Sequence, residues 1–120
     1  MRIAVTSTGK DMDSNMDPRF GRAAYFIIVN LETMEYETVE NSQSLNLPQG
    51  AGIQAGKTII DNNVDVLITG NCGPKAFQVL QSASVKIFTG AEGSVADAVS
   101  KYKNGDLKSS GEANVEGHWV

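Results

Sequence analysis

Chemically useful residues gather in a short turn near the middle of the sequence. The segment Val64–Leu80 begins with a β-branched apolar run, continues through the turn Gly70–Gly73, and resumes an apolar periodic pattern after Pro74. This order predicts a strand buried on both faces, a tight loop and a helix N-terminus. Ligands of open α/β sheets settle at strand ends of this kind, often against helix N-termini. The turn is therefore the first candidate site.

Cys72, the only cysteine of the chain, lies in this turn. A thiol just before a helix N-terminus is expected to have a lowered pKa and to favour the thiolate, which could ligate a soft metal or a cluster. The alternative is a small structural loop residue. A zinc site needs three or four protein ligands, and the only histidine, His118, lies close to the C-terminus. No nucleophile–base pair can be assembled, which favours a binding protein over an enzyme.

The elements that must position this turn follow from the apolar periodicity. We expect strands over 2–6, 25–29, 35–39, 64–68 and 85–88, and helices over 51–62, from Pro74 onward and over 94–104. This order predicts an α/β domain with a five-stranded mixed sheet flanked by three helices. The first, fourth and fifth strands would be parallel, joined by right-handed crossovers. Their carboxyl ends would gather three loops, Ser7–Lys10, Gly70–Gly73 and Thr89–Gly93.

Two smaller patterns refine this prediction. Ser94 and Asp97 have the spacing of a capping box at the start of the last helix, and Gly105 is well placed to end it. The polar segment Asn41–Gly50 is expected to be a loop, and the polar residues 108–120 a flexible C-terminal tail.

The polar segment Asp11–Arg22 is long for a loop in a small domain, and such loops are usually functional. Its alternating acidic residues resemble the first half of a calcium-binding loop, but Met16 and Arg22 occupy positions that need glycine and glutamate. We therefore expect this loop to face the two glycine turns. Because its aspartates would repel an anion, they should point to water and Arg19 should point inward.

The segment Ala51–Thr58 fits a relaxed phosphate-loop pattern, in which glycine N–H groups and a lysine bind phosphate. A phosphate loop must follow a strand directly, whereas a polar stretch precedes this one. We expect Lys57 to lie on a helix whose glycines permit close packing. A nucleotide-binding switch or enzyme remains the alternative function that this segment would support.

Composition limits the function classes further. The chain has 120 residues, 41% hydrophobic and 20% charged residues, and a formal net charge of −4, which fits one globular domain and gives no electrostatic case for nucleic acid. No apolar run approaches the roughly 20 residues that span a bilayer. A single cysteine and the absence of a visible signal-peptide pattern favour the cytoplasm.

Five short motifs in order resemble the dinitrogenase iron–molybdenum cofactor biosynthesis family, of the NifX-like and NifB carboxy-terminal type. They are Ile3–Val5, Arg19–Phe26, Gly50–Ala55, Ile68–Phe77 and Gly90–Val95. The resemblance covers residues 1–107 and implies a ribonuclease-H-like fold. It also implies a non-catalytic protein that binds or carries iron–molybdenum cofactor, its precursors or a related metal–sulfur cluster, with a cofactor-assembly protein as partner.

One departure from the family pattern concerns Arg19. In nitrogenase-associated members a histidine commonly stands there before the Phe-Gly pair, and it is a candidate cluster ligand. Arginine cannot ligate a metal, but it can pair with an anionic cluster, oxyanion or thioanion. The resemblance also includes small proteins that hold mixed molybdenum–copper–sulfur clusters noncovalently.

The predicted cofactor-binding residues come from all three strand ends and from the long loop. Cys72 is also the candidate metal ligand, and a protein–protein interaction domain is the third functional alternative. The predicted set is Ser7, Thr8, Arg19, Phe20, Gly21, Arg22, Gly70, Asn71, Cys72, Gly73, Pro74, Gly90, Ala91, Glu92 and Gly93.

Overall fold

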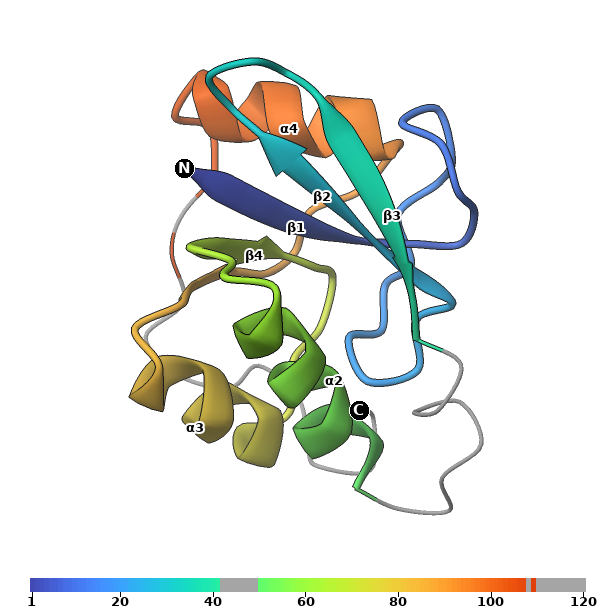
Figure 1. Cartoon of the computed structure of the whole chain (residues 1–120). Coiled ribbons are helices and arrows are strands. Elements are labelled where there is room, and N and C mark those ends of the chain that lie inside the picture. The colour runs from blue at the N-terminus through green and yellow to red at the C-terminus, as the bar shows by residue number, and fades with distance from the viewer. Residues whose placement is uncertain (42–49, 108, 110–120) are drawn as a thin grey trace.

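A computed structural model describes residues 1–41, 50–107 and 109, and it contains the predicted strands and helices (Figure 1). The strands are β1 (Arg2–Ser7), β2 (Tyr25–Asn30), β3 (Tyr36–Glu40), β4 (Val66–Ile68) and β5 (Lys86–Phe88). The helices are α2 (Ala51–Asp61), α3 (Pro74–Ser82) and α4 (Val95–Lys103).

The strands form one mixed sheet in the order β3-β2-β1-β4-β5. β1 is parallel to β4, with Val5 opposite Ile68, and β4 is parallel to β5, with Ile68 opposite Phe88. β2 is antiparallel to both β1 and β3. The predicted α/β class, mixed sheet and parallel set are therefore confirmed, and the carboxyl ends of β1, β4 and β5 meet at one edge.

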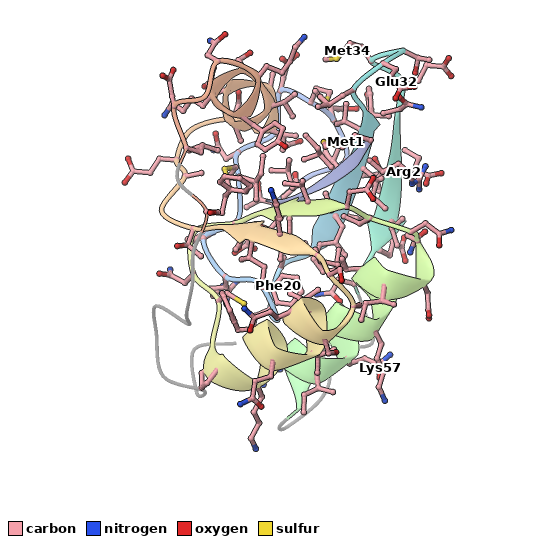
Figure 2. All side chains as sticks on the ribbon, turned by 90° about the vertical axis from the view of Figure 1, so that its left-hand side faces the viewer. Met1, Arg2, Phe20, Glu32, Met34 and Lys57 are labelled. Atoms are coloured by element: carbon pink, nitrogen blue, oxygen red, sulfur yellow. The ribbon has the colours of Figure 1, made fainter. Side chains whose placement is uncertain are left out.

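Helices cover both faces of the sheet, with α4 on one face and α2 and α3 on the other (Figure 1). Because side chains alternate along a strand, neighbouring residues enter different cores. Ile3 and Val5 pack in the core beneath α4, whereas Ala4 lies in the core beneath α2 and α3. Figure 2 shows Phe20 inside that second core and Lys57 at the surface of α2, so the prediction that Lys57 lies on a helix is confirmed.

All three helices begin on the side of the sheet where the parallel strand β1 has its carboxyl end. α3 follows β4 and α4 follows β5, while α2 leads back to the opposite edge, where β4 begins (Figure 1). The α4 capping box is present, since Ser94 Oγ accepts a hydrogen bond from Asp97 N and the Asp97 side chain accepts one from Ser94 N. Gly105 has φ 75° just past the helix, as expected of a helix stop.

Element ends differ slightly from the prediction. β4 begins at Val66 and β5 at Lys86, because Val64 and Val85 are buried against the helices rather than paired in the sheet. The predicted loop 41–50 and tail 108–120 fall largely outside the described residues, apart from Ser109, which bridges Phe88. Within the described residues no helix is long and apolar enough to cross a membrane.

Candidate functional site

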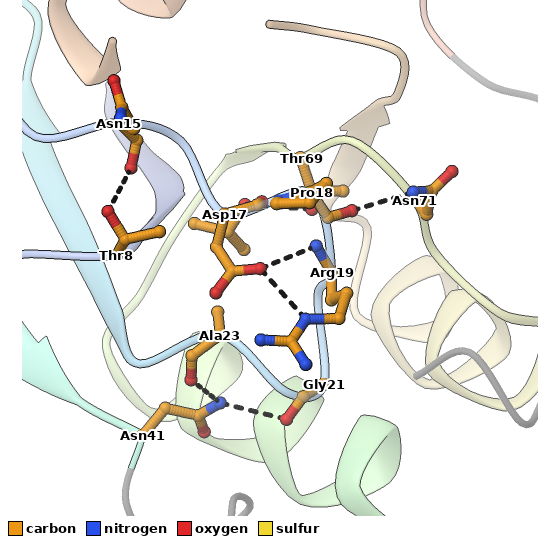
Figure 3. Close-up of polar contacts among 11 residues, drawn as sticks. Thr8, Asn15, Asp17, Pro18, Arg19, Gly21, Ala23, Asn41, Thr69 and Asn71 are labelled. Atoms are coloured by element: carbon orange, nitrogen blue, oxygen red, sulfur yellow. Dashed lines mark hydrogen bonds and ion pairs between the residues drawn. The ribbon is translucent and has the colours of Figure 1, made fainter. Parts of the chain in front are cut away.

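The Asp11–Arg22 loop is fastened across the ends of β1 and β4 (Figure 3). Asp17 N donates a hydrogen bond of 3.0 Å to Thr6 O, and Thr6 Oγ1 donates one of 2.7 Å to Asp17 O. Thr6 Oγ1 also lies 3.0 Å from Thr69 Oγ1, at the end of β4. Both threonines are fully buried, so these hydroxyls tie the loop to two strands of the sheet.

The turn after β4 packs directly under the loop. Phe20 N donates to Asn71 O at 3.2 Å, and Asn71 Nδ2 donates to Pro18 O at 3.1 Å (Figure 3). A Cβ atom on Gly70 would lie 2.7 Å from Pro18 Cα, so only glycine permits this approach. The predicted contact between the long loop and the Gly70–Gly73 turn is confirmed.

The turn after β5 contacts the same loop. Met16 N donates to Gly93 O at 2.9 Å, and Gly90 N donates to Gly70 O at 2.9 Å, which joins the two glycine turns. A groove of about 270 Å³ runs between the loop and this turn, lined by Asn15, Met16, Pro18, Ala91, Glu92 and Gly93. Sequence reasoning included the last three of these residues and missed the first three, although it singled out their loop.

Asp17 and Arg19 have the opposite placement from the one predicted. Asp17 is only 3% exposed, and its Oδ1 accepts hydrogen bonds from Arg19 N at 3.0 Å and from Arg19 Nε at 3.3 Å (Figure 3). The two N–H donors allow a carboxylate to be buried here. The Arg19 side chain is 51% exposed and lies back over Asp17. Among the described residues its Nη atoms make no further hydrogen bond.

The predicted lowering of the Cys72 pKa is also wrong. Cys72 is completely buried in the core beneath α2 and α3. Burial removes water from the thiolate and raises the pKa to about 12. The Sγ atom lies 3.8 Å from Gly73 O, a weak thiol hydrogen bond. At neutral pH the group is therefore a neutral thiol.

The N-terminus of α4 is already occupied by this chain. Val95 N donates to Ser14 O at 2.9 Å and Ala96 N donates to Met12 O at 2.9 Å, while Asp97 N donates to Ser94 Oγ at 3.0 Å. The backbone N–H groups at the start of a helix are the ones that can bind an anion. Here the long loop and the capping box use all three.

The N-termini of α3 and α2 differ from that of α4, because their first backbone N–H groups are not used by the rest of the described chain. Neither N-cap residue, Gly73 for α3 or Gly50 for α2, makes a side-chain cap hydrogen bond. Among the described residues, Lys75 N and Ala76 N of α3 have no hydrogen-bond partner. The same is true of the N–H groups of 51–53 in α2. The start of α2 was not among the predicted site residues.

The remaining predicted residues divide between the surface and the core. Ser7 is buried, and its hydroxyl donates to Gly9 O at 2.7 Å, while Thr8 is exposed and donates to Asn15 O at 3.1 Å. Phe20 belongs to the loop, but its side chain points into the core. Its ring centroid lies 5.6 Å from that of Phe26. Such core residues shape the site and do not present side chains to a ligand.

Asn41, which sequence reasoning missed, fixes the far end of the loop. Its Nδ2 donates to Gly21 O at 3.1 Å and to Ala23 O at 2.8 Å (Figure 3), and its backbone N donates to Ala24 O at 3.1 Å. The half-buried Arg22 is held in this stretch. A polar residue just past a strand gave no pattern that would have revealed this contact.

The donor chemistry of this edge decides what kind of metal-containing ligand it fits. Among residues 1–41, 50–107 and 109, no three His, Cys, Asp or Glu side chains are grouped so that they could hold a metal ion. The one thiol is buried and neutral. The edge instead offers backbone N–H groups and a guanidinium, which fit an anion that brings its own inner ligands.

Comparison with known proteins agrees with this description. Residues 1–105 match the model of the family described as dinitrogenase iron-molybdenum cofactor. An uncharacterized protein of Methanocaldococcus jannaschii is 26% identical over 112 residues, covering 90% of this chain and 94% of that protein.

Solved structures show the same fold. The apo form of the orange protein from Desulfovibrio gigas is 43% identical, with a TM-score of 0.93, over 95% of this chain and 96% of that one. A putative NifB protein from Thermotoga is 35% identical, with a TM-score of 0.79, over 90% of this chain and 91% of that one.

Proposed function

This chain belongs to the dinitrogenase iron-molybdenum cofactor family, and from that premise we propose that it is a non-catalytic binding or carrier protein for an anionic metal–sulfur cofactor. The family description supports a cofactor of iron and molybdenum. The structure of the similar orange protein is described as an apo form, which supports a ligand-binding role. In line with the resemblance seen in the sequence, the proposed ligand is an iron–molybdenum cofactor or a cluster of molybdenum with iron or copper.

One observation carries the proposal: two helices with unused N-terminal donors begin at the same sheet edge, where a loop carrying Arg19 and Arg22 is fastened. α2 and α3 pack against each other, since a Cβ on Gly56 would lie 3.1 Å from Val79 Cγ1. Each open N-terminus favours an anion by about 0.3–1 kcal/mol at an exposed site. Arg19 adds a charge on a side chain that is 51% exposed, and its Nη donors make no hydrogen bond among the described residues.

The proposed mode of binding is noncovalent. A cluster that contains sulfide or oxo ligands needs hydrogen-bond donors and positive charge from the protein rather than metal ligands. Lys75 N and Ala76 N at the start of α3 would supply donors on one side, and the groove beside 90–93 would accept the apolar or sulfur-bearing part of the ligand. Ligation by Cys72 is the alternative, and it would require exposing and ionising a thiol whose pKa is about 12.

Titration with tetrathiomolybdate, followed by visible absorption, tests this proposal. We expect the Arg19→Ala variant to bind about tenfold more weakly, because charge-assisted hydrogen bonds contribute about 1.5–3 kcal/mol and half-exposure reduces this to the lower limit. Arg19→Lys should recover part of the affinity, since lysine lacks the planar fork. Lys57→Ala is the matched control, because it removes a cation from the exposed side of α2.

Amide chemical shifts locate the ligand independently of affinity. The proposal expects the largest shifts at 51–53 and at Lys75 and Ala76, and small shifts at Val95 and Ala96. Equal affinity in all four proteins, together with shifts confined to α4 or scattered over the surface, would refute an anion site at this edge. Complete loss of binding in a folded Cys72→Ser variant would establish the ligation alternative.

A further inference from the structure

β3 lies at one edge of the sheet, and the flanking hydrogen bonds show which of its backbone groups point outward. Asn30 N donates to Glu35 O at 2.9 Å before the ladder, and Asn41 N donates to Ala24 O at 3.1 Å after it. Hydrogen-bonded pairs alternate along antiparallel strands. Odd-numbered residues of β3 therefore face β2, and Tyr36, Thr38 and Glu40 direct their N–H and C=O groups away from the sheet.

Within the described part of the chain, no strand pairs with this outer edge. Proteins commonly protect such an edge with lysine, proline or a bulge. β3 contains no lysine or proline, and its register with β2 is continuous from Tyr25–Glu40 to Val29–Tyr36. The edge is thus regular enough to accept another strand.

Two of the exposed large apolar side chains among the described residues, Met34 and Tyr36, lie beside this edge and are 42% and 45% exposed. The third, Met1, precedes β1, two strands away in the sheet, and is 50% exposed. Figure 2 shows Met1 and Met34 at the same end of the molecule as Glu32. Tyr36 is on β3 itself, and Met34 is in the turn that leads to it. Met34 and Tyr36 therefore add exposed apolar surface beside the outer edge of β3.

Every charged residue of β3 and of the turn before it is acidic. Residues 31–40 contain four glutamates and no lysine or arginine. A groove of about 250 Å³ lies beside β3, and Glu35, Tyr36 and Glu37 line it. Arg2 Nη2 pairs with Glu37 Oε1 at 2.8 Å, and Lys103 Nζ lies 3.9 Å from Met34 Sδ on the α4 side. Among the described residues the Glu35 carboxylate makes no hydrogen bond or ion pair, and the Glu37 side chain is 57% exposed despite its contact with Arg2.

We propose that the outer edge of β3 is a docking site for an extended segment of another protein that carries lysine or arginine at alternate positions. The segment would extend the sheet, with backbone hydrogen bonds to Tyr36, Thr38 and Glu40. Its basic side chains would face Glu35 and Glu37, which lie on one face because side chains alternate along a strand, and its apolar ones would cover Tyr36 on the other face. A second copy of this chain fits less well, because its own glutamates would meet these.

This proposal is independent of the cofactor site. The apolar part of the surface lies at the end of the sheet where β1 begins, whereas the glycine turns lie where β1 ends. Loss of one function by mutation therefore leaves the other testable.

The test uses a synthetic peptide, acetyl-Lys-Val-Lys-Val-Lys-amide, added to the full-length protein labelled with ¹⁵N. Amide hydrogen exchange should slow by about tenfold at Tyr36, Thr38 and Glu40 at saturating peptide. Exchange at Glu37 and Val39 should stay unchanged, because these groups already bond to β2. A matched peptide with glutamate in place of lysine should have no effect.

Charge reversal tests whether the basic peptide is recognised by the glutamates beside the outer edge of β3. The variant Glu35→Lys with Glu37→Lys should bind the basic peptide about tenfold more weakly, since two attractions become repulsions. The control, Asp61→Lys with Asp106→Lys, also brings the net charge from −4 to zero and should bind within twofold of wild type. Unchanged exchange at the three amides, equal protection by the acidic peptide, or protection that grows with protein concentration without peptide would each overturn the proposal.

Discussion

α3 and α4 begin at the same edge of the sheet, and each follows a glycine turn after a parallel strand, yet their N-termini are in opposite states. In α4 the N–H groups of Val95 and Ala96 bind carbonyls of the long loop, and Asp97 N binds the capping serine. In α3 a proline occupies the first position, and the next two N–H groups have no partner in the described residues.

This difference separates structural helix starts from those that can bind a ligand. The α4 start is an anchor that fixes the Asp11–Arg22 loop, so its donors are not available to an anion. The α3 start has donors left over, and so does that of α2. The four predictions below test this contrast, beginning with the largest expected effect.

The first prediction concerns Cys72, which lies at the α3 start but within the core. With the pKa raised from 9.0 to about 12, the thiolate population at pH 8 falls about a thousandfold. Alkylation by iodoacetamide in the native protein should therefore be at least a hundredfold slower than in 6 M guanidinium chloride. The raised pKa also implies that the folded state binds the extra proton above pH 9, so the stability relative to Cys72→Ala should fall as the pH rises beyond 9.

Mass spectrometry of the time course measures this rate. Fast alkylation of the folded protein at pH 8 would mean that the thiol is exposed and ionised, and the α3 start would then hold a reactive group rather than only backbone donors.

The second prediction concerns Gly70, on which the α3 turn and the loop depend. Gly70→Ala places Cβ 2.7 Å from Pro18 Cα and O, and backbone atoms cannot move aside as a side chain can. We expect the free energy of unfolding to fall by about 1–3 kcal/mol. Gly56→Ala is the matched control, because its Cβ would meet only the Val79 side chain at 3.1 Å, and alanine favours the helix by about 1 kcal/mol. Urea denaturation measures the free energy of unfolding of both variants. An equal decrease in the two would show that the loop can move away from the added methyl group at little cost.

Local sequence patterns predicted most of the fold. Apolar runs such as Tyr25–Val29 determine strand positions because each must bury its side chains, and Gly105 and the Ser94–Asp97 pair determine helix ends through local backbone chemistry. The ribonuclease-H-like label and the boundary at residue 107 stay predictions.

The site was harder to predict because its details depend on contacts between distant residues. Nothing in the order Asp17-Pro18-Arg19 indicates which charge is buried; the answer depends on the hydrogen bonds that fix Asp17 to Thr6. The α4 donors are filled by carbonyls about 80 residues earlier in the chain. Cys72 is buried because α2 and α3 close over it. Each of these facts requires the assembled sheet edge.

The third prediction concerns Ser94, the cap of the occupied helix. Ser94→Ala removes the acceptor of Asp97 N and should lower the free energy of unfolding by about 1 kcal/mol. The Ser94 backbone and side-chain hydrogen bonds hold the pKa of Asp97 below its usual value, so the cap's contribution is present at neutral pH and is lost as the pH falls through that lowered pKa. Tetrathiomolybdate affinity should stay within twofold of wild type at pH 7. A large loss of affinity in the folded variant would place the ligand at α4 and reverse the comparison.

The fourth prediction, with the smallest expected effect, concerns Lys57 and extends the comparison to α2. The α2 start resembles that of α3 in lacking a side-chain cap, and its sequence fits a relaxed phosphate-loop pattern. Lys57 nevertheless lies six residues after Ala51 within the helix, with an exposed side chain (Figure 2). In a phosphate loop the lysine must reach phosphates cradled by a loop, which a helical backbone cannot form. ATP with magnesium should therefore not bind with micromolar affinity, and Lys57→Ala should change nothing in calorimetry. Tight, magnesium-dependent binding abolished by this substitution would show that α2 serves a nucleotide, and the two open helix starts would then have separate ligands.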